Sequence, residues 1–119
     1  MKTKAQSLSE AGLFSKLVAD VRDSVLTTAE LALITGVEER QVYNWASGAS
    51  KPRSEAKDKL LEVHYIIKEL REVYTPEGAD IWIHARNRGL GGEKPINLLS
   101  AGAFEPVLAA IERLKTGAM

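Results

Sequence analysis

"TTAELALITGVEERQVYNWASG", residues 27–48, predicts two short helices joined by a tight turn, and this pair decides the fold. Thr27 followed by Glu30 is typical of a capping box, in which the hydroxyl accepts a hydrogen bond at the start of the helix and the carboxylate reaches back. Gly36 suits the left-handed backbone that ends one helix and redirects the chain. The second helix is expected over residues 39–46, with Val42 and Trp45 on its inward side.

A helix-turn-helix needs a short support helix, a glycine-bearing turn, and a second helix that is apolar inside and polar outside. Opposite the inward side of the second helix lie Arg40 and Asn44, with Tyr43 beside them. Arginine can bridge O6 and N7 of guanine in the major groove, and asparagine can bridge N6 and N7 of adenine. Lys51 and Arg53, just past the following loop, are placed for contacts to phosphates. The segment therefore indicates a surface that reads DNA.

The spacing alone leaves a second interpretation open. Two short helices joined by a glycine turn also occur in many all-α cores, where exposed arginine and asparagine are ordinary surface residues. Glu38 and Glu39 favour the dipole at the start of the second helix, but their charges repel nearby phosphates.

The flanking sequence has the three-and-four spacing of apolar residues that is typical of amphipathic helices. One helix is expected from Ser9 to about Val25, and a long one from Ser54 to near Thr75. The apolar positions of the long helix cover two faces, so we expect it to pack on its own domain and also on either the C-terminal segment or a second subunit. Shorter helices are expected over residues 77–85, 95–99 and 104–114.

No stretch shows the alternation of a strand, so the predicted fold class is all-α. We expect a helix-turn-helix bundle, then a long linking helix and a small C-terminal helical domain. The expected boundaries are a disordered tail over residues 1–8, the helix-turn-helix domain with its long helix over residues 9–75, and the C-terminal domain over residues 76–119.

The composition narrows the class of protein. The 119 residues suit one compact domain, or a small module with an appended piece. Sixteen basic and sixteen acidic residues cancel, which argues against a protein that coats nucleic acid but leaves room for a specific reader with paired subunits. The chain has no cysteine for disulfides or thiolate metal sites. No apolar run approaches the length of a membrane span or forms a signal peptide, so we expect a cytoplasmic protein.

Histidine and carboxylate side chains often catalyse reactions in enzymes, but in this sequence their spacing does not favour a catalytic site. His64 and His84 each lack a second histidine three or four residues away, which a helical metal site requires. Glu38 and Glu39 are adjacent, and adjacent helical residues diverge instead of converging on one proton. We therefore expect no enzyme activity, no metal and no cofactor.

Two patterns near the start of the chain carry a family resemblance. They are T-x-A-E-L-A-x-x-T-G-V over residues 27–37 and R-Q-V-Y-N-W-x-x-G-x-x-x-P over residues 40–52, and together they closely resemble the Xre/Cro repressor-like helix-turn-helix family. In that family the second helix enters the major groove, where its first turn and the residue one turn later contact bases. The resemblance implies base contacts by Glu39, Arg40 and Asn44, with Gln41 near the DNA backbone, and operator DNA as a partner.

Residues 82–107 carry a second pattern, W-x-x-x-x-N-x-x-L-G-G-x-K-P-I-x-L-L-x-x-G-x-x-x-x-V. No strand precedes its glycine loop, so a nucleotide-binding loop of the usual kind is not expected. The pattern resembles the toxin-binding domain of the MbcA/ParS/Xre antitoxins, and the order of the two segments is also that of this family. The resemblance implies a type II antitoxin whose C-terminal domain binds a RES-domain toxin, an enzyme that destroys NAD. It also implies a homodimer that represses its own operon.

The second pattern does not decide which residues contact the toxin. We expect exposed groups beside the glycine loop and at the end of the chain, namely Arg86, Arg88, Glu93, Arg113, Lys115, Gly117, Ala118 and Met119. The alternative is a stand-alone dimeric DNA-binding regulator without a toxin partner, because the apolar face of the long helix supports dimerisation as well as it supports toxin binding. A neighbouring gene for a RES-domain toxin separates the two hypotheses.

Overall fold

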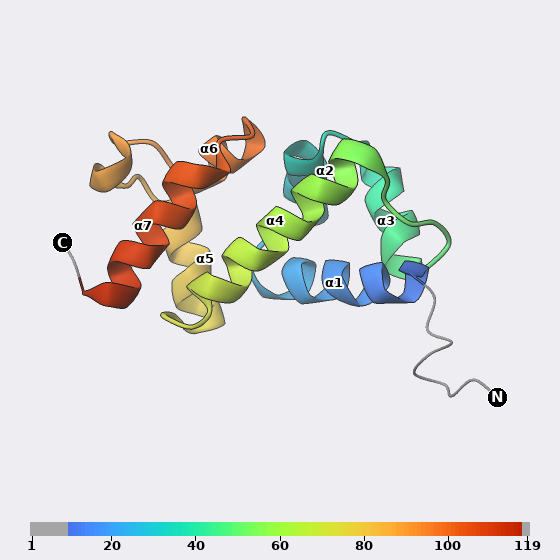
Figure 1. Cartoon of the computed structure of the whole chain (residues 1–119), viewed down its shortest axis with the longest axis horizontal. Coiled ribbons are helices and arrows are strands. Elements are labelled where there is room, and N and C mark those ends of the chain that lie inside the picture. Colours follow the sequence, from blue (N-terminus) through green and yellow to red (C-terminus); the bar gives the residue numbers. More distant parts are fainter. Residues whose placement is uncertain (1–9, 118–119) are drawn as a thin grey trace.

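The computed structural model describes residues 10–117, and every named element in this part of the chain is a helix, as predicted (Figure 1). The tail expected over residues 1–8 lies outside the described residues. Residues 10–117 form an elongated body of about 52 × 29 × 24 Å without an extended strand. Its elements are α1 (Glu10–Ser24), α2 (Thr28–Thr35), α3 (Glu39–Ser47), α4 (Ser54–Leu70), α5 (Pro76–His84), the short 3₁₀ helix η1 (Arg88–Leu90), α6 (Pro95–Ser100) and α7 (Phe104–Thr116).

The pair α2 and α3 forms as its local sequence predicts. The Thr27 Oγ1 atom accepts a hydrogen bond from the Glu30 backbone N–H at 3.1 Å, and the Glu30 carboxylate accepts one from the Thr27 N–H at 2.9 Å. Gly36 ends α2 in the left-handed region, with φ of 79°, which costs glycine little because it has no Cβ. Val42 and Trp45 are both buried. The capping box and the turn therefore fix where α2 begins and ends, and the turn sets the direction in which α3 follows.

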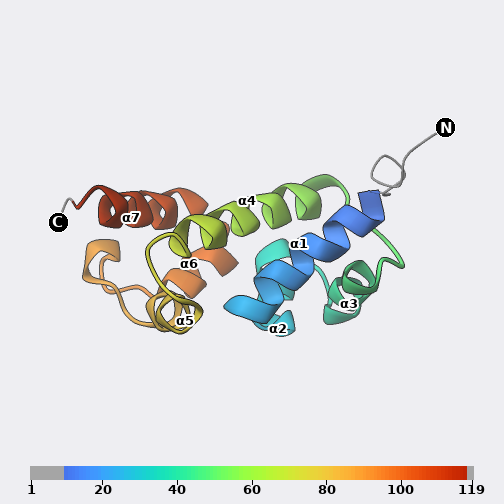
Figure 2. The same ribbon diagram turned by 90° about the horizontal axis from the view of Figure 1, so that it is seen from below.

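The long helix α4 links the two halves of the molecule. It packs against α1 and α2 on one side and against α7 on the other, and Figure 2 shows α7 beside its C-terminal part. Lys115 of α7 pairs with Glu69 and Glu72 at that end of α4. The buried residues of α4 are Leu60, Val63, Ile66, Ile67 and Leu70. The C-terminal segment thus covers the second apolar face of α4, which is one of the two predicted alternatives.

The predicted end of the long helix is wrong, because α4 stops at Leu70 and not near Thr75. Thr75 is the N-cap of α5, where its hydroxyl accepts a hydrogen bond from the Gly78 N–H at 3.2 Å, and Pro76 follows it. A residue before proline is driven out of the helical region by the proline ring, and Thr75 is extended, with ψ of 169°. The backbone therefore leaves the helix in a turn over residues 71–73.

One apolar cluster runs through both halves of the described chain, from Phe14 of α1 to Ile111 of α7. Within the described residues, none of the helices is both long enough and apolar enough to cross a membrane. The division at residues 75 and 76 stays a prediction.

A histidine joins the two halves at a second point. The His84 Nε2 atom of α5 lies 2.7 Å from the Glu30 carboxylate of α2, and its Nδ1 atom lies 2.8 Å from the Asp80 carbonyl oxygen. Both partners are acceptors, so only an imidazolium, with a proton on each nitrogen, donates to both. Desolvation lowers the pKa of His84, but the hydrogen bonds that it donates to the Asp80 carbonyl oxygen and the Glu30 carboxylate, together with the two carboxylate charges, outweigh it, so the pKa is raised above its ordinary value of 6.5.

We predict unequal effects for two neighbouring leucines of α4. Leu60 is fully buried, whereas Leu61 is 41% exposed, so a cavity opens only at the first position. Leu60→Ala should lower the free energy of unfolding by about 2–5 kcal/mol, and Leu61→Ala by less than about 1 kcal/mol. Urea titration followed by circular dichroism measures both. Equal losses of unfolding free energy in the two variants would show that α4 does not bury Leu60 and expose Leu61 as described.

We also predict a pH-dependent contribution from His84. Because its folded-state pKa is raised, its stabilisation is fully present below the unfolded pKa and is lost as the pH rises through the folded pKa. The stability of the wild type relative to His84→Gln should therefore be greatest at about pH 6 and should shrink as the pH rises. Glu30→Gln keeps the side-chain cap and should reduce the same pH dependence. Thermal unfolding across this range measures it, and parallel curves for the wild type and His84→Gln would contradict the assignment.

Candidate functional site

The outer face of α3 carries the residues predicted to read DNA, at one end of the molecule. Figure 1 and Figure 2 both place α3 at the end opposite to α7. Glu39, Arg40, Gln41 and Tyr43 are exposed, and Asn44 is half-buried. Arg40 and Asn44 lie one turn apart, so their side chains project from the same face of α3, opposite to buried Val42 and Trp45.

Four predicted DNA-binding residues meet at one side of α3. Gln41, Asn44, Lys51 and Arg53 line a cavity of about 400 Å³ between α3 and the start of α4. The Pro52 side chain, which lines the same cavity, is buried and holds the loop against the core. The structure therefore brings helix residues and loop residues to one place, as a phosphate-binding edge requires.

Lys51 already has an anionic partner, which the sequence did not indicate. Its Nζ atom lies 2.6 Å from one oxygen of the Glu10 carboxylate, and the Lys57 Nζ atom lies 3.7 Å from the other oxygen. The hydrogen bond from Lys51 and the charges of both lysines lower the pKa of Glu10. A phosphate at this edge must therefore compete with Glu10 for Lys51. Glu10 lies 41 residues away in the sequence, and only packing shows the contact.

The flank of α3 that carries Tyr43 and Ala46 packs on α1, whose first residue, Glu10, also reaches Lys51. The Ser15 hydroxyl donates to the Ala46 carbonyl oxygen at 2.5 Å, which fixes α1 along α3. In the last turn of α1, the Arg22 guanidinium lies 5.8 Å from the centre of the Tyr43 ring. Sequence analysis missed Arg22, because α1 was interpreted only from its apolar positions.

The glycine loop of the C-terminal half is a closed turn. The Asn87 N–H donates to the Glu93 carbonyl oxygen at 3.0 Å, and the Gly92 N–H donates to the Asn87 carbonyl oxygen at 2.9 Å. Gly91 and Gly92 have φ of 68° and 85°, a region that disfavours residues with a Cβ. Pro95 is buried at the first turn of α6. These glycine and proline positions of the family pattern therefore shape the backbone.

Four of the eight predicted toxin-binding residues gather around this loop, beside α7. Arg86 donates to the Gly92 carbonyl oxygen at 3.2 Å, and Arg88 and Glu93 are exposed. The Arg113 guanidinium reaches the loop, since a Cβ built on Gly89 would lie 3.5 Å from it.

The remaining predicted toxin-binding residues belong to the last five positions of the chain. Lys115 is held by the carboxylates of Glu69 and Glu72, and these two hydrogen bonds raise its pKa. Gly117 is exposed at the end of α7. Ala118 and Met119 lie outside the described residues. The structure thus brings Arg86, Arg88, Glu93 and Arg113 together, and it shows Lys115 engaged within the chain.

An apolar groove adjoins the same loop and was not predicted. It has a volume of about 420 Å³ and is lined by Tyr74, Gly78, Ile81, Trp82, Ala85, Arg86, Asn87 and Arg88. Ile81 is 69% exposed, and Trp82 is only partly buried. An apolar residue in a helical pattern is normally taken as core, so only its exposure in the fold distinguishes Ile81.

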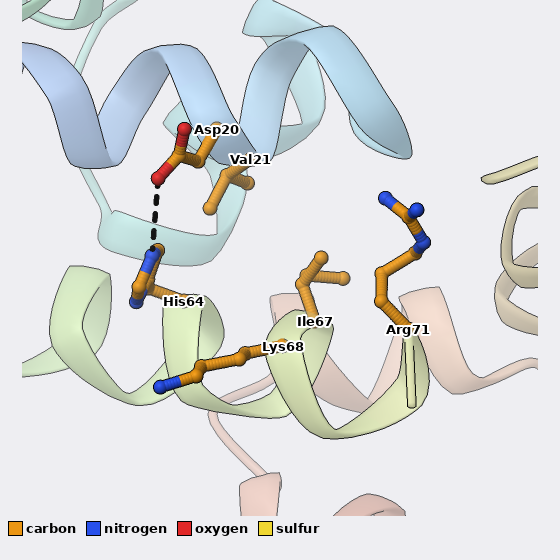
Figure 3. Close-up of a pocket in the computed structure, with 6 residues that line it drawn as sticks. All are labelled: Asp20, Val21, His64, Ile67, Lys68 and Arg71. Atoms are coloured by element: carbon orange, nitrogen blue, oxygen red, sulfur yellow. Dashed lines mark ion pairs between the residues drawn. The ribbon is translucent and has the colours of Figure 1, made fainter. Parts of the chain in front are cut away.

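A third cavity lies between α1 and α4 and bears on the question of catalysis (Figure 3). Its volume is about 420 Å³, and Asp20 and His64 face each other across it with 3.7 Å between Oδ2 and Nε2. Its other lining residues are Val21, Ile67, Lys68 and Arg71. The lining therefore holds one carboxylate and no hydroxyl nucleophile. Residues 10–117 also hold no group of three acidic, histidine or cysteine side chains that could bind a metal.

Comparisons with known proteins identify relatives of this chain. No family model matches. The chain is 32% identical over 114 residues to the probable mycobacterial cidal antitoxin Rv3188 of Mycobacterium tuberculosis, covering 96% of this chain and 97% of that protein. It is 33% identical over 92 residues to the mycobacterial cidal antitoxin MbcA of Mycobacterium bovis, covering 77% of this chain and 81% of MbcA.

The fold has a solved counterpart as well. It matches a chain in the crystal structure of the M. tuberculosis MbcT–MbcA toxin–antitoxin complex with a TM-score of 0.77 and 29% identity, covering 88% of this chain and 96% of that one. These matches extend over both halves of the molecule and agree with the family indicated by the pattern of residues 82–107. The chain therefore belongs to the MbcA family of antitoxins.

Proposed function

We propose that this protein is the antitoxin of a type II toxin–antitoxin pair, which binds and blocks a RES-domain toxin that degrades NAD. The observation that carries the proposal is the match, over nearly the whole chain, to an antitoxin family with a member solved in complex with its toxin. The second role is repression of its own operon, as a homodimer, through α2 and α3.

The toxin-binding surface is assigned to the C-terminal half, around the apolar groove and the glycine loop. Ile81 is the most exposed large apolar side chain within residues 10–117, and the Trp82 ring lies beside it in the groove. Protein interfaces have apolar and aromatic centres with polar rims, in which arginine is enriched. Arg86 and Arg88 supply such a rim.

The DNA-binding surface is assigned to α3 and the loop that follows it. Arg40 and Asn44 suit base edges, and Lys51 and Arg53 suit phosphates. The cations at this surface are few and the net charge is zero, so a single copy has modest affinity. Two linked copies raise the affinity, because the second contact becomes intramolecular. The two surfaces lie at opposite ends of the molecule (Figure 1), which lets one copy engage both partners.

For the toxin surface, we predict that Ile81→Ser weakens binding of the RES-domain toxin encoded beside this gene by about tenfold or more. Leu33→Ser is the matched control, because Leu33 is equally exposed on α2, in the other half. Calorimetry gives the affinities, and an NAD-consumption assay reports neutralisation. Equal binding by both variants would remove the groove from the interface. If the protein forms no complex with any NAD-consuming toxin, the alternative hypothesis of a stand-alone DNA-binding regulator is favoured instead.

For the DNA surface, we predict that Arg40→Ala and Asn44→Ala each weaken operator binding by about 1–3 kcal/mol, the value of a bidentate base contact. Both variants should neutralise the toxin like the wild type, since α3 lies far from the C-terminal half. Gel-shift titration at fixed salt measures the first effect. Loss of neutralisation in either variant would show that the two roles share one surface.

A further inference from the structure

We propose that Arg22 of α1, stacked on Tyr43, contacts a DNA phosphate on the side of α3 opposite to Lys51 and Arg53. This inference rests on the proposed DNA-binding function and adds a second edge to the same site. In this arrangement α3 lies between Arg22 on one flank and Lys51 and Arg53 on the other. Each flank then faces a different DNA strand.

The helical geometry puts the two edges on opposite sides. With 100° between successive residues, Gln41 and Tyr43 project to the two flanks of α3, and Arg40 and Asn44 lie between them. Gln41 lines the cavity that Lys51 and Arg53 share. Tyr43 lies under the Arg22 guanidinium, at 5.8 Å from its ring centre. The cations therefore flank the base-reading face from both sides.

The shape of DNA makes this arrangement useful. The major groove is about 12 Å wide and admits one α-helix, whose two flanks then face the two phosphate backbones. Contacts to phosphates fix how the protein is placed on the duplex. A protein with cations on a single flank is anchored to one strand, whereas cations on both flanks hold α3 centred in the groove.

The surroundings of Arg22 favour a contact with a phosphate. A cation–π interaction with Tyr43 holds the guanidinium beside α3 and still leaves its N–H groups at the edge of the ring. Among the side chains that the structure describes, no carboxylate pairs with Arg22, whereas Lys51 is paired with Glu10. Tyr43 is 54% exposed and Arg22 is half-buried, so the stacked pair is partly open to solvent. Arg22 therefore offers a charge for which no described carboxylate competes.

The salt dependence of DNA binding tests the proposal. The probe is a duplex carrying the promoter of this gene, titrated with the full chain between about 50 and 200 mM salt. Arg22→Gln should lower the slope of log K against log salt by about one phosphate contact and weaken operator and unrelated DNA alike. Arg22→Lys should restore most of the slope. Lys68→Gln is the matched control, since Lys68 is an exposed cation on the C-terminal half of α4, and its slope should equal that of the wild type.

A second measurement maps the phosphates that matter, first with the wild-type protein, so that this part does not depend on how the variants fold. Single phosphates of the duplex are replaced one at a time by uncharged methylphosphonates. The proposal expects sensitive phosphates on both strands of each half-site, and those on one strand should become insensitive in Arg22→Gln.

The outcomes separate the inference from the function on which it rests. A wild-type protein that does not bind the promoter, alone or with its toxin, would overturn both the DNA-binding role and the Arg22 contact. Normal promoter binding with an unchanged slope in Arg22→Gln, or with sensitive phosphates on one strand only, would overturn the Arg22 contact alone. Unchanged toxin binding by Arg22→Gln shows that the variant is folded.

Discussion

The burial of α4 on two faces is the constraint on which the rest of the molecule depends. One helix of 17 residues carries the apolar side chains that α1 and α2 cover on one side and α7 covers on the other. Both halves bury apolar residues against this helix, and the hydrophobic effect scales with the apolar area removed from water. The two surfaces assigned to DNA and toxin are therefore carried by one cooperative unit. A partner that binds at one end of the molecule therefore contacts a unit whose hydrophobic core extends to the other end.

Glu30 shows how a local signal acquires a tertiary role. One oxygen of its carboxylate caps α2, and the other binds His84 of α5. The first contact places α2 and thereby α3, and the second ties that half to the C-terminal half. The same carboxylate therefore helps to orient the helix proposed to bind DNA and to join the two halves. Its capping partner is three residues away and visible in the sequence, whereas His84 is 54 residues away.

The distribution of charge suits the proposed roles, which need modest affinity for DNA and firm affinity for a protein. Cations near α3 are few, and one of them, Lys51, is partly neutralised by Glu10. The C-terminal half instead combines an exposed isoleucine with arginines around a rigid loop. Weak phosphate contacts make binding sensitive to the number of copies assembled, which is how a complex of several subunits gains specificity.

The sequence by itself determined the fold class, the capping box of α2, the buried side of α3 and the family, because each depends on residues within a few turns of one another. It also located most of the candidate DNA-binding residues, which lie on one helix and its following loop. Only the tertiary structure decided which side chains beyond these reach the same surfaces: Arg22 beside Tyr43, Glu10 on Lys51, His84 on Glu30, and Ile81 left exposed in a groove. The physical reason is that periodicity shows which face of a helix is apolar. Which neighbour covers that face, and which charges meet across the contact, depends on how the helices pack.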